Sequence, residues 1–316
     1  MLAVAEHFVR PPNWEWYILA YFFLAGLAGG SYALATTLRI WGHPRDEAAA
    51  RLGFYISFPS LLACPLLLTS DLGASWWKFW HMLVNVTPGQ VGLNFKYWSP
   101  MSVGAWALTV FGLFSTVSFI EALVLDKRLR NPLGDLLARA LRGGVGRAFN
   151  IVGAVIGVYL ASYTGVLLSV SNQPLWSDTW ALGGLFLASG LSASAALIGL
   201  LARRRADARF SETWVRQADG YFAGLEFVLL LVFFGTLATA GTVNRALGFP
   251  WILLWAVAAV GLVPALSALA RPQVRARVGG GGALSRAAIT STGLASLIVL
   301  VGVLALRAAV MFSAQQ

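Results

Sequence analysis

Residues 16–40 read WYILAYFFLAGLAGGSYALATTLRI, and Arg39 is the only charged side chain among them. A bilayer core about 30 Å thick needs roughly 20 such residues in a helix. Seven further segments of the 316-residue chain read in the same way, near 50–72, 100–125, 148–171, 179–202, 215–241, 250–270 and 287–313. They are too long for membrane strands and lack the polar alternation of such strands. The sequence therefore predicts an all-α integral membrane protein with eight transmembrane helices.

The composition excludes the common alternatives to a membrane protein. Hydrophobic residues make up 58% of the chain and charged residues 11%, with a mean hydropathy of +0.71. Soluble domains carry about 25% charged residues, and disordered chains combine low hydrophobicity with high charge. The net charge of +10 could indicate a nucleic-acid partner, but membrane proteins collect basic residues in cytoplasmic loops. We therefore expect a lipid bilayer around the chain and no nucleic acid.

The basic residues also predict an orientation. Four loops that lie on one side of an eight-helix chain, 39–51, 127–147, 203–216 and 271–286, hold three, six, five and four of the 23 lysines and arginines. The positive-inside rule makes that side the cytoplasm. We expect a multi-pass protein of the bacterial cytoplasmic (inner) membrane. Both termini and the loops 73–99, 172–178 and 242–249 would then lie on the periplasmic side.

Cysteine and histidine usage bounds the redox chemistry of the chain. Cys64 is its single cysteine, which is too few for an iron–sulfur cluster or a cysteine zinc site. The three histidines, His7, His43 and His81, fall in or beside polar connections and not as pairs within helices. We therefore predict no haem, no iron–sulfur cluster and no metal site in this chain.

The predicted outer loop 73–99 is long and unusually aromatic. Tryptophan and tyrosine favour the headgroup layer of a membrane, so the loop is expected to lie along the outer face as an interfacial segment. It is either a plain aromatic belt or a docking platform above a lipid-soluble substrate, and the two can coexist. Its large aromatic residues are Trp76, Trp77, Phe79, Trp80, Phe95, Tyr97 and Trp98.

Charged residues inside spans are costly and are therefore functional candidates. Asp71 ends the second span on the outer side, Glu226 lies near the middle of the sixth, and Glu121 and Asp219 lie toward cytoplasmic ends. Arg307, in the outer part of the eighth span, is a possible counter-charge. These acids mark three depths, as a proton path would. The alternative is that each is neutralised by a partner or reaches water.

Polar aromatic residues gather at the outer end. Tyr17 and Tyr21 are four residues apart on one helix face, with Trp14 and Asn13 one turn further out. Tyr163 lies in the outer half of the fourth span, and His81 follows Asp71 in the aromatic loop. A quinone needs a lipid-accessible slot, a partner for each carbonyl and a titratable group, which these residues supply. Interfacial anchoring is the alternative for the two tyrosines, and a solvated loop position for His81.

Small residues suggest how the helices pack. Gly26, Gly29 and Gly30 in the first span, and Gly190, Ala193 and Ser194 in the fifth, are typical of closely packed membrane helices. The stretches 23–34 and 186–197 look alike and would run in the same direction, which indicates two related halves. We predict two four-helix bundles, 1–171 with the outer loop and a quinone site, and 172–316.

Several ordered motifs resemble the NrfD/PsrC family, the quinone-interacting membrane subunits of polysulfide reductase and related complexes. The run Trp14–Gly30 resembles the first helix of that family. Further matches follow in chain order: Asp71-Leu-Gly with Lys78-Phe-Trp-His81, Ser99–Trp106, Ser162–Ser169 with Pro174-Leu-Trp176, Phe186–Leu191, and Leu306-Arg307. Each match is weak alone, but the ordered set covers nearly the whole chain and is fairly specific.

The resemblance implies eight helices in two four-helix bundles, no haem in this subunit, and a menaquinone or ubiquinone site near the periplasmic surface. It also implies a four-cluster, ferredoxin-like iron–sulfur subunit docked on the outer face, with a catalytic subunit of the molybdopterin or multihaem cytochrome type beyond it. Tyr163 matches a quinone-contacting tyrosine and Asp71 an acidic position. Some members have a histidine where this chain has Tyr21 and an asparagine where it has Ile18. Because of these departures, the quinone chemistry is expected to depend more on Asp71, His81 and Tyr163.

The leading hypothesis is thus a quinone/quinol-reactive subunit of a multisubunit oxidoreductase, which is not catalytic alone. Asp71 and His81 are the candidate catalytic residues, and Tyr163, Tyr21, Tyr17, Trp14 and Asn13 would bind the quinone. Glu226, Glu121, Asp219 and Arg307 are the candidate proton path. A proton-coupled secondary transporter and a passive membrane anchor are the alternatives.

Overall fold

The computed structural model describes residues 10–73, 76–141, 143–270 and 286–315, without the side chains of 270 and 286–292. His7 and almost all of the predicted basic loop 271–286 lie outside the described residues. The membrane-length helices are α1 (Trp16–Trp41), α2 (Glu47–Ser70), α3 (Pro100–Leu125), α5 (Gly144–Ser169), α6 (Leu182–Arg204), α7 (Glu212–Ala240), α9 (Trp251–Ala270) and α10 (Arg286–Ser313). Within the described residues, eight helices are long and apolar enough to cross a membrane. The predicted all-α membrane fold is confirmed.

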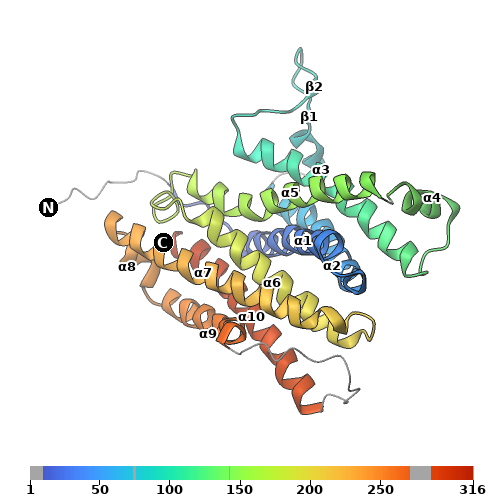
Figure 1. The fold of residues 1–316 in the computed structure, drawn as a ribbon. Helices are drawn as coiled ribbons and strands as arrows, with labels where there is room; N and C mark the ends of the chain where they lie inside the picture. The colour runs from blue at the N-terminus through green and yellow to red at the C-terminus, as the bar shows by residue number, and fades with distance from the viewer. Residues whose placement is uncertain (1–9, 74–75, 142, 271–285, 316) are drawn as a thin grey trace.

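Short elements connect these helices. They are the 3-10 turns η1 (Pro44–Asp46), η2 (Trp76–Met82) and η3 (Arg209–Ser211), the helices α4 (Pro132–Ala140) and α8 (Val243–Leu247), and an antiparallel pair of two-residue strands, β1 (Val84–Asn85) and β2 (Gly92–Leu93). The pair projects from the helices in Figure 1. The sequence predicted α4 and α8 only as polar loops, because neither is long enough to show an apolar period.

Hydrogen-bonded turns precede the two spans whose starts differ from the predicted ones. Helix α2 begins at Glu47, three residues earlier than predicted, because η1 is closed by a reciprocal cap. The His43 ring accepts a hydrogen bond from Arg45 N at 3.2 Å, and the Asp46 carboxylate accepts one from His43 N at 2.7 Å. Helix α6 begins only at Leu182, because a turn stabilised by the 2.8 Å bond from Leu175 N to the Asp178 carboxylate precedes it.

Helices α1 and α6 lie at the centre of the fold and are the most buried spans. Helix α1 packs against α2, α5, α6 and α10, and α6 packs against α1, α5, α7 and α10 (Figure 1). Glycines allow the close crossing of α1 and α6. A Cβ on Gly30 would lie 2.6 Å from Ser194 Oγ, and one on Gly190 would lie 3.1 Å from Gly26 Cα. The predicted small-residue packing is confirmed, while the division into two bundles stays a prediction.

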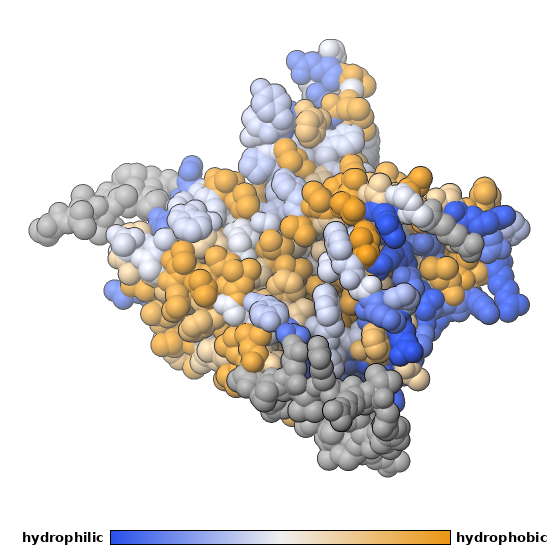
Figure 2. Space-filling view, viewed as in Figure 1, coloured by the Kyte–Doolittle hydropathy of each residue, from blue (hydrophilic) through white to orange (hydrophobic). Residues whose placement is uncertain are grey.

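The two ends of the fold differ in polarity. Figure 2 shows hydrophilic side chains gathered at the end that carries α4, and apolar side chains over the middle of the molecule. Helices α1 and α3 end, and α2 and α5 begin, at the end with α4. We call it the inner end, and we call the opposite end the outer end. The first and last described segments meet at the outer end, where Trp14 N donates to Gln315 Oε1 at 2.8 Å.

Candidate functional site

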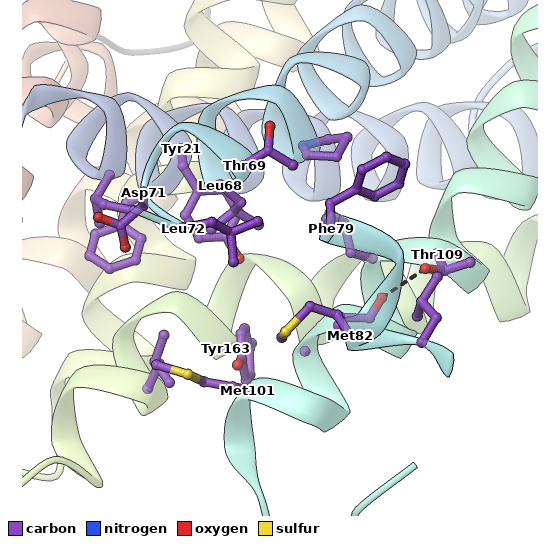
Figure 3. Close-up of a pocket in the computed structure, with 18 of the residues that line it drawn as sticks. Tyr21, Leu68, Thr69, Asp71, Leu72, Phe79, Met82, Met101, Thr109 and Tyr163 are labelled. Carbon is purple, nitrogen blue, oxygen red and sulfur yellow. Dashed lines mark hydrogen bonds between the residues drawn. The ribbon is translucent and has the colours of Figure 1, made fainter. Parts of the chain in front are cut away.

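An apolar pocket of about 260 Å³ lies at the outer end between α1, α2, α3, α5 and η2. In Figure 3, Tyr163 and Met101 face Leu68 and Leu72 across the cavity, and η2 closes one side with Phe79 and Met82. We call it the outer pocket. Its lining residues are Trp14, Ile18, Tyr21, Phe22, Pro65, Leu68, Thr69, Asp71, Leu72, Phe79, Met82, Leu83, Met101, Gly104, Ala105, Leu108, Thr109, Tyr163 and Leu167. Few of these side chains are polar, so each polar one matters for what the pocket can bind.

Tyr163 lies in the outer half of α5 and is buried against the start of α3. Its hydroxyl donates a 2.6 Å hydrogen bond to the carbonyl oxygen of Pro100. The ring lies directly on the backbone of Gly104, where a Cβ would come within 2.3 Å of the hydroxyl oxygen. The missing side chain at Gly104 therefore allows Tyr163 to take this position. The hydroxyl keeps a lone pair with which it can accept a second hydrogen bond.

Asp71 caps the outer end of α2 and is partly exposed. Its backbone N–H donates to Leu68 O at 3.2 Å, which holds the carboxylate at the pocket edge. Partial burial raises the pKa of Asp71 and the negative charge of Glu15 adds to this, while a hydrogen bond from the Tyr17 hydroxyl opposes it. The net effect is a raised pKa, so this carboxyl group keeps its proton to a higher pH than a free aspartic acid.

Helix α1 supplies the opposite wall with Ile18, Tyr21 and Phe22, all of them buried. Trp14, just before the helix, extends this wall and stacks on Trp176 at a centroid distance of 5.3 Å. Tyr21 and Ile18, the two departures from the resembled family, thus both line the pocket. A buried tyrosine hydroxyl here can donate to a bound acceptor, whereas Ile18 offers only apolar surface.

The structure brings together Trp14, Tyr21, Asp71 and Tyr163 but not the other three predicted site residues. Tyr17 reaches Asp71 without lining the pocket, and Asn13 is exposed. His81 lies in η2, edge-on to the Trp80 ring at 4.2 Å, and its carbonyl oxygen accepts a hydrogen bond from Asn94. The roles of these residues stay predictions.

Sequence reasoning missed the contribution of η2 and α3 to the walls. The aromatic loop was expected to lie over the site, yet Phe79, Met82 and Leu83 enter the lining directly. Their spacing of three to four residues is that of one helical face, and this was the available signal. Met101 falls within the Ser99–Trp106 match, which assigned it no role, and no pattern marked Leu108.

The four charged residues of the predicted proton path fall into two separate places. Glu121 lies at the inner end of α3, where its carboxylate accepts a 2.7 Å hydrogen bond from Arg39. Glu226, Asp219 and Arg307 lie among α6, α7 and α10, and the Ser192 hydroxyl donates to Asp219 at 2.7 Å. The Glu226 Oε2 atom has no hydrogen-bond partner within the described part of the chain.

Arg307 is completely buried, and the structure identifies its partners. Its guanidinium donates to the carbonyl oxygens of Phe22 and Phe186 and to the Ser189 hydroxyl, and it interacts electrostatically with Glu226. Phe22 lines the outer pocket. Arg307 therefore ties α10 to α1 and α6 directly behind the pocket wall.

A second, polar cavity of about 360 Å³ lies at the inner end. We call it the inner cavity, and it is lined by Arg39, Ile40, Glu47, Arg51, Glu121, Leu125, Ala138, Leu141, Gly143, Gly146, Arg147 and Asn150. Arg39 pairs with Glu47 at 2.6 Å and with Glu121 at 2.7 Å. Over the residues that the structure describes, no three histidine, cysteine or acidic side chains are grouped to hold a metal ion.

The fold and the two cavities define a multi-pass membrane protein with an apolar pocket near one end of its spans. A family profile described as "Polysulphide reductase, NrfD" matches residues 4–316, and the chain belongs to this family. The resemblance carried by Trp14–Gly30 and the motifs after it is confirmed.

Individual relatives agree with this assignment. The sequence is 29% identical to that of a polysulfide reductase subunit of Wolinella succinogenes, over 96% of this protein and 94% of the relative. It is 28% identical to the protein NrfD of Escherichia coli, over 96% and 95% of the two proteins. A selenate reductase subunit of Mesobacillus selenatarsenatis is 32% identical over 25% of this protein and 18% of its own length.

Proposed function

We propose that this protein is the quinone- and quinol-binding membrane subunit of a respiratory oxidoreductase complex. It exchanges electrons between the membrane quinone pool and an iron–sulfur subunit docked on its outer face. The observation that carries the proposal is the outer pocket, which sets Tyr21, Tyr163 and Asp71 into an otherwise apolar lining. Two relatives are, by name, subunits of reductases, which supports membership in such a complex.

The pocket fits the head group of menaquinone or ubiquinone. Ligand sites of about 300–1,000 Å³ are usual, and a cavity of about 260 Å³ is close to the lower end of that range. It therefore suits a ring whose isoprenoid tail remains in lipid. The apolar walls favour the ring face, and the tyrosine hydroxyls and the carboxyl group are suited to its two polar oxygens. A bound quinone supplies the two-electron carrier chemistry that the side chains themselves lack.

The polar residues of the pocket have separate roles. The Tyr21 hydroxyl donates a hydrogen bond to one quinone carbonyl oxygen. Tyr163 orients the other oxygen: while its hydroxyl donates to Pro100 it accepts a hydrogen bond from a quinol hydroxyl, and it donates to a quinone carbonyl only by releasing Pro100. His81, Tyr17, Trp14 and Asn13 support this outer rim. Asp71 exchanges a proton with one quinone oxygen. Its raised pKa suits this role, because an acid–base group works best when its pKa approaches the working pH.

Electrons reach the pocket from a neighbouring polypeptide, because one cysteine and three histidines cannot hold a series of redox centres across this protein. The proposed neighbour is the four-cluster iron–sulfur subunit, with a molybdopterin or multihaem catalytic subunit beyond it. The proposed setting is the bacterial inner membrane with both termini periplasmic. Residues 1–171 would form the quinone-binding bundle and 172–316 the second bundle, in which Glu226, Asp219 and Arg307 handle protons.

No observation favours the secondary transporter. Substrate sites in many transporters are built from helices that are broken at mid-membrane. Helix α2 runs through Pro59 and Pro65, and α9 runs through Pro264, each as one continuous helix.

Asp71→Asn tests the proposal. In the purified complex we expect quinone-coupled turnover to fall by about 100-fold or more, since a lost acid–base group commonly costs that much. Assembly should persist, because Asp71 is partly exposed at a helix end. Asp135→Asn, on exposed α4 at the other end, is the matched control and should behave as the wild type. Full activity of Asp71→Asn would remove Asp71 from the mechanism.

A further inference from the structure

The main chain at Trp14 is held by one side chain from the far end of the sequence. Trp14 N donates to Gln315 Oε1 at 2.8 Å, and Gln315 Nε2 donates to Trp14 O at 3.2 Å. The same Nε2 atom donates to Met311 O, in the last turn of α10, at 3.3 Å. The Gln315 amide therefore pairs with Trp14 in both directions, as neighbouring strands of a sheet do, and it connects residues 301 positions apart.

Helix α1 does not itself hold Trp14 in place. The helix begins at Trp16, and the amide of Ile18 donates to Glu15 O. Among the described residues, Gln315 is the hydrogen-bond partner of both main-chain groups of Trp14, and no other is present. Glutamine suits this position because its side chain carries an acceptor and two donor hydrogens at the same end, whereas an ionised glutamate carries acceptors alone.

The ring of Trp14 is placed as closely as its main chain. It lies at 22° to the Trp176 ring, at a centroid distance of 5.3 Å, and edge-on to Phe22 at 6.0 Å. Trp176 is completely buried, and its Nε1 atom donates to Val310 O of α10 at 2.8 Å. Trp14 also lines the outer pocket. The plane of this indole in the pocket wall is thus set by groups that lie behind the wall.

Neither Gln315 nor any described residue of α10 lines the outer pocket. Gln315 can therefore reach a bound molecule through Trp14 and not by touching it. A side chain that has to be ordered when a ligand binds weakens the affinity by about 2- to 13-fold. A residue that holds Trp14 in position beforehand removes this cost.

Anchoring of α10 alone does not explain the pairing. The same helix end is already held by Gln173, whose Nε2 atom donates to Ala314 O, and by Trp176. Both of these side chains are buried, whereas Gln315 is half-buried. What distinguishes Gln315 is that its acceptor and a donor both bind the main chain of a residue in the pocket wall.

We propose that Gln315 is a positioning residue for the quinone site. It fixes Trp14 in the wall before the quinone enters, and so it sets the affinity for quinone and not the rate of the chemical steps. The inference rests on the proposed function and deepens it. Asp71 and Tyr163 have no hydrogen bond to Trp14 or Gln315 among the described contacts. Proton exchange at Asp71 therefore continues when Gln315 is replaced.

The test compares the purified wild-type complex with Gln315→Leu, which keeps a side chain of similar size and removes the donor and the acceptor. We expect the Kd and the KM for quinone to rise by about 2- to 13-fold. The kcat at saturating quinone and its pH dependence should not change. A merely structural role would instead lower kcat or the yield of assembled complex. Hydrogen exchange measured without quinone should be faster at the Trp14 amide in the variant.

Gln315→Glu keeps the length and the acceptors but loses both donor hydrogens, and it should also raise the KM if Gln315→Leu fails to assemble. Gln173→Leu is the matched control, because it removes a hydrogen bond to the same end of α10 without a partner on Trp14. It should keep the quinone Kd and the Trp14 exchange rate of the wild type.

Wild-type quinone affinity in the Gln315 variants would overturn the role of Gln315, and so would an unchanged exchange rate at Trp14. An equal loss of affinity in Gln173→Leu would also overturn it, because anchoring of α10 would then suffice. In each of these cases the wild type still binds quinone, so the proposed function stands. A wild type that binds no quinone would overturn the proposed function itself.

Discussion

Gly104→Ala is expected to disturb the outer pocket by displacing Tyr163. A Cβ at this position would lie 2.3 Å from both Cζ and Oη of Tyr163, whereas ordinary contacts begin near 3.4 Å. The end of the ring must therefore move by at least about 1 Å. A shift of that size breaks or greatly lengthens the 2.6 Å hydrogen bond to the Pro100 carbonyl oxygen.

The magnitude follows from two contributions. Overpacking of a filled site costs about 1–3 kcal/mol, and loss of a buried hydrogen bond costs about 0.5–1.5 kcal/mol. Together they lower the stability of the protein by roughly 2–4 kcal/mol. A quinone that loses its hydrogen bond to Tyr163 loses a comparable 0.5–1.5 kcal/mol, or about 2- to 13-fold in affinity.

Gly112→Ala is the matched control on the same helix. Nothing lies within 4 Å of a Cβ at Gly112, so the change should be neutral or should stabilise α3 by up to about 1 kcal/mol. The assay is a quinone titration of the purified complex, with thermal unfolding measured in parallel. Gly104→Ala with wild-type quinone affinity would refute the assignment of Tyr163 to the quinone, and wild-type stability would refute the close packing of Tyr163 on Gly104.

Three further predictions concern charged groups. Burial raises the pKa of Asp71, so an infrared titration should show a protonated carboxyl band that persists to higher pH than in a free aspartic acid. A wild-type titration identical to that of Asp71→Asn would contradict this. Partial burial alone would raise the pKa of Asp126, but the hydrogen bond from Arg205, with its neighbours, holds it below the usual value. The ionised Asp126 carboxylate therefore stabilises the folded state. This stabilisation is present above the pKa of about 3.9 that the group has in the unfolded chain, and it is lost as pH falls through the lower pKa of the folded protein. Arg205→Met should therefore cost about 1.5–3 kcal/mol at neutral pH and move the acid transition in thermal unfolding to higher pH, and an unmoved transition would count against it. Glu226→Gln should lower the number of protons moved per electron in vesicles, and an unchanged ratio would exclude this residue from the proton path.

The sequence predicted the spans well because each depends on a local property, the length of an apolar run. Boundaries such as Glu47 and Leu182 follow hydrogen-bonded turns between residues two or three apart, and the length of an apolar run does not register such turns. Helix α4 was missed because its nine residues lie in a loop whose arginines dominate the pattern.

The candidate site was predicted in part. Asp71, Tyr21, Tyr163 and Trp14 carry a signal in the sequence, namely polar or aromatic groups at the ends of spans, and all four line the outer pocket. The buried hydroxyl pairs Tyr32–Ser118 and Ser57–Ser115 carried none. Serines and a tyrosine within apolar helices are unremarkable until the structure sets hydroxyl groups of different helices within 3.0 Å of each other.

The structure was also needed to show that the residues of the predicted proton path lie in two separate places. Glu121 and Asp219 lie at similar depths in the sequence pattern, yet one pairs with Arg39 on α1 and the other accepts a hydrogen bond from Ser192 on α6. Depth can be counted along a helix, whereas the lateral position of a side chain depends on how the helices pack.

The most direct test of the account is a structure of the assembled complex with a bound quinone. The account predicts quinone density in the outer pocket, with its oxygens within hydrogen-bond distance of Tyr163 and within reach of Asp71, and an iron–sulfur cluster of the neighbouring subunit above it. Quinone density elsewhere in the membrane domain, with the outer pocket filled by lipid or sealed from it, would contradict the account, and so would a haem between the helices.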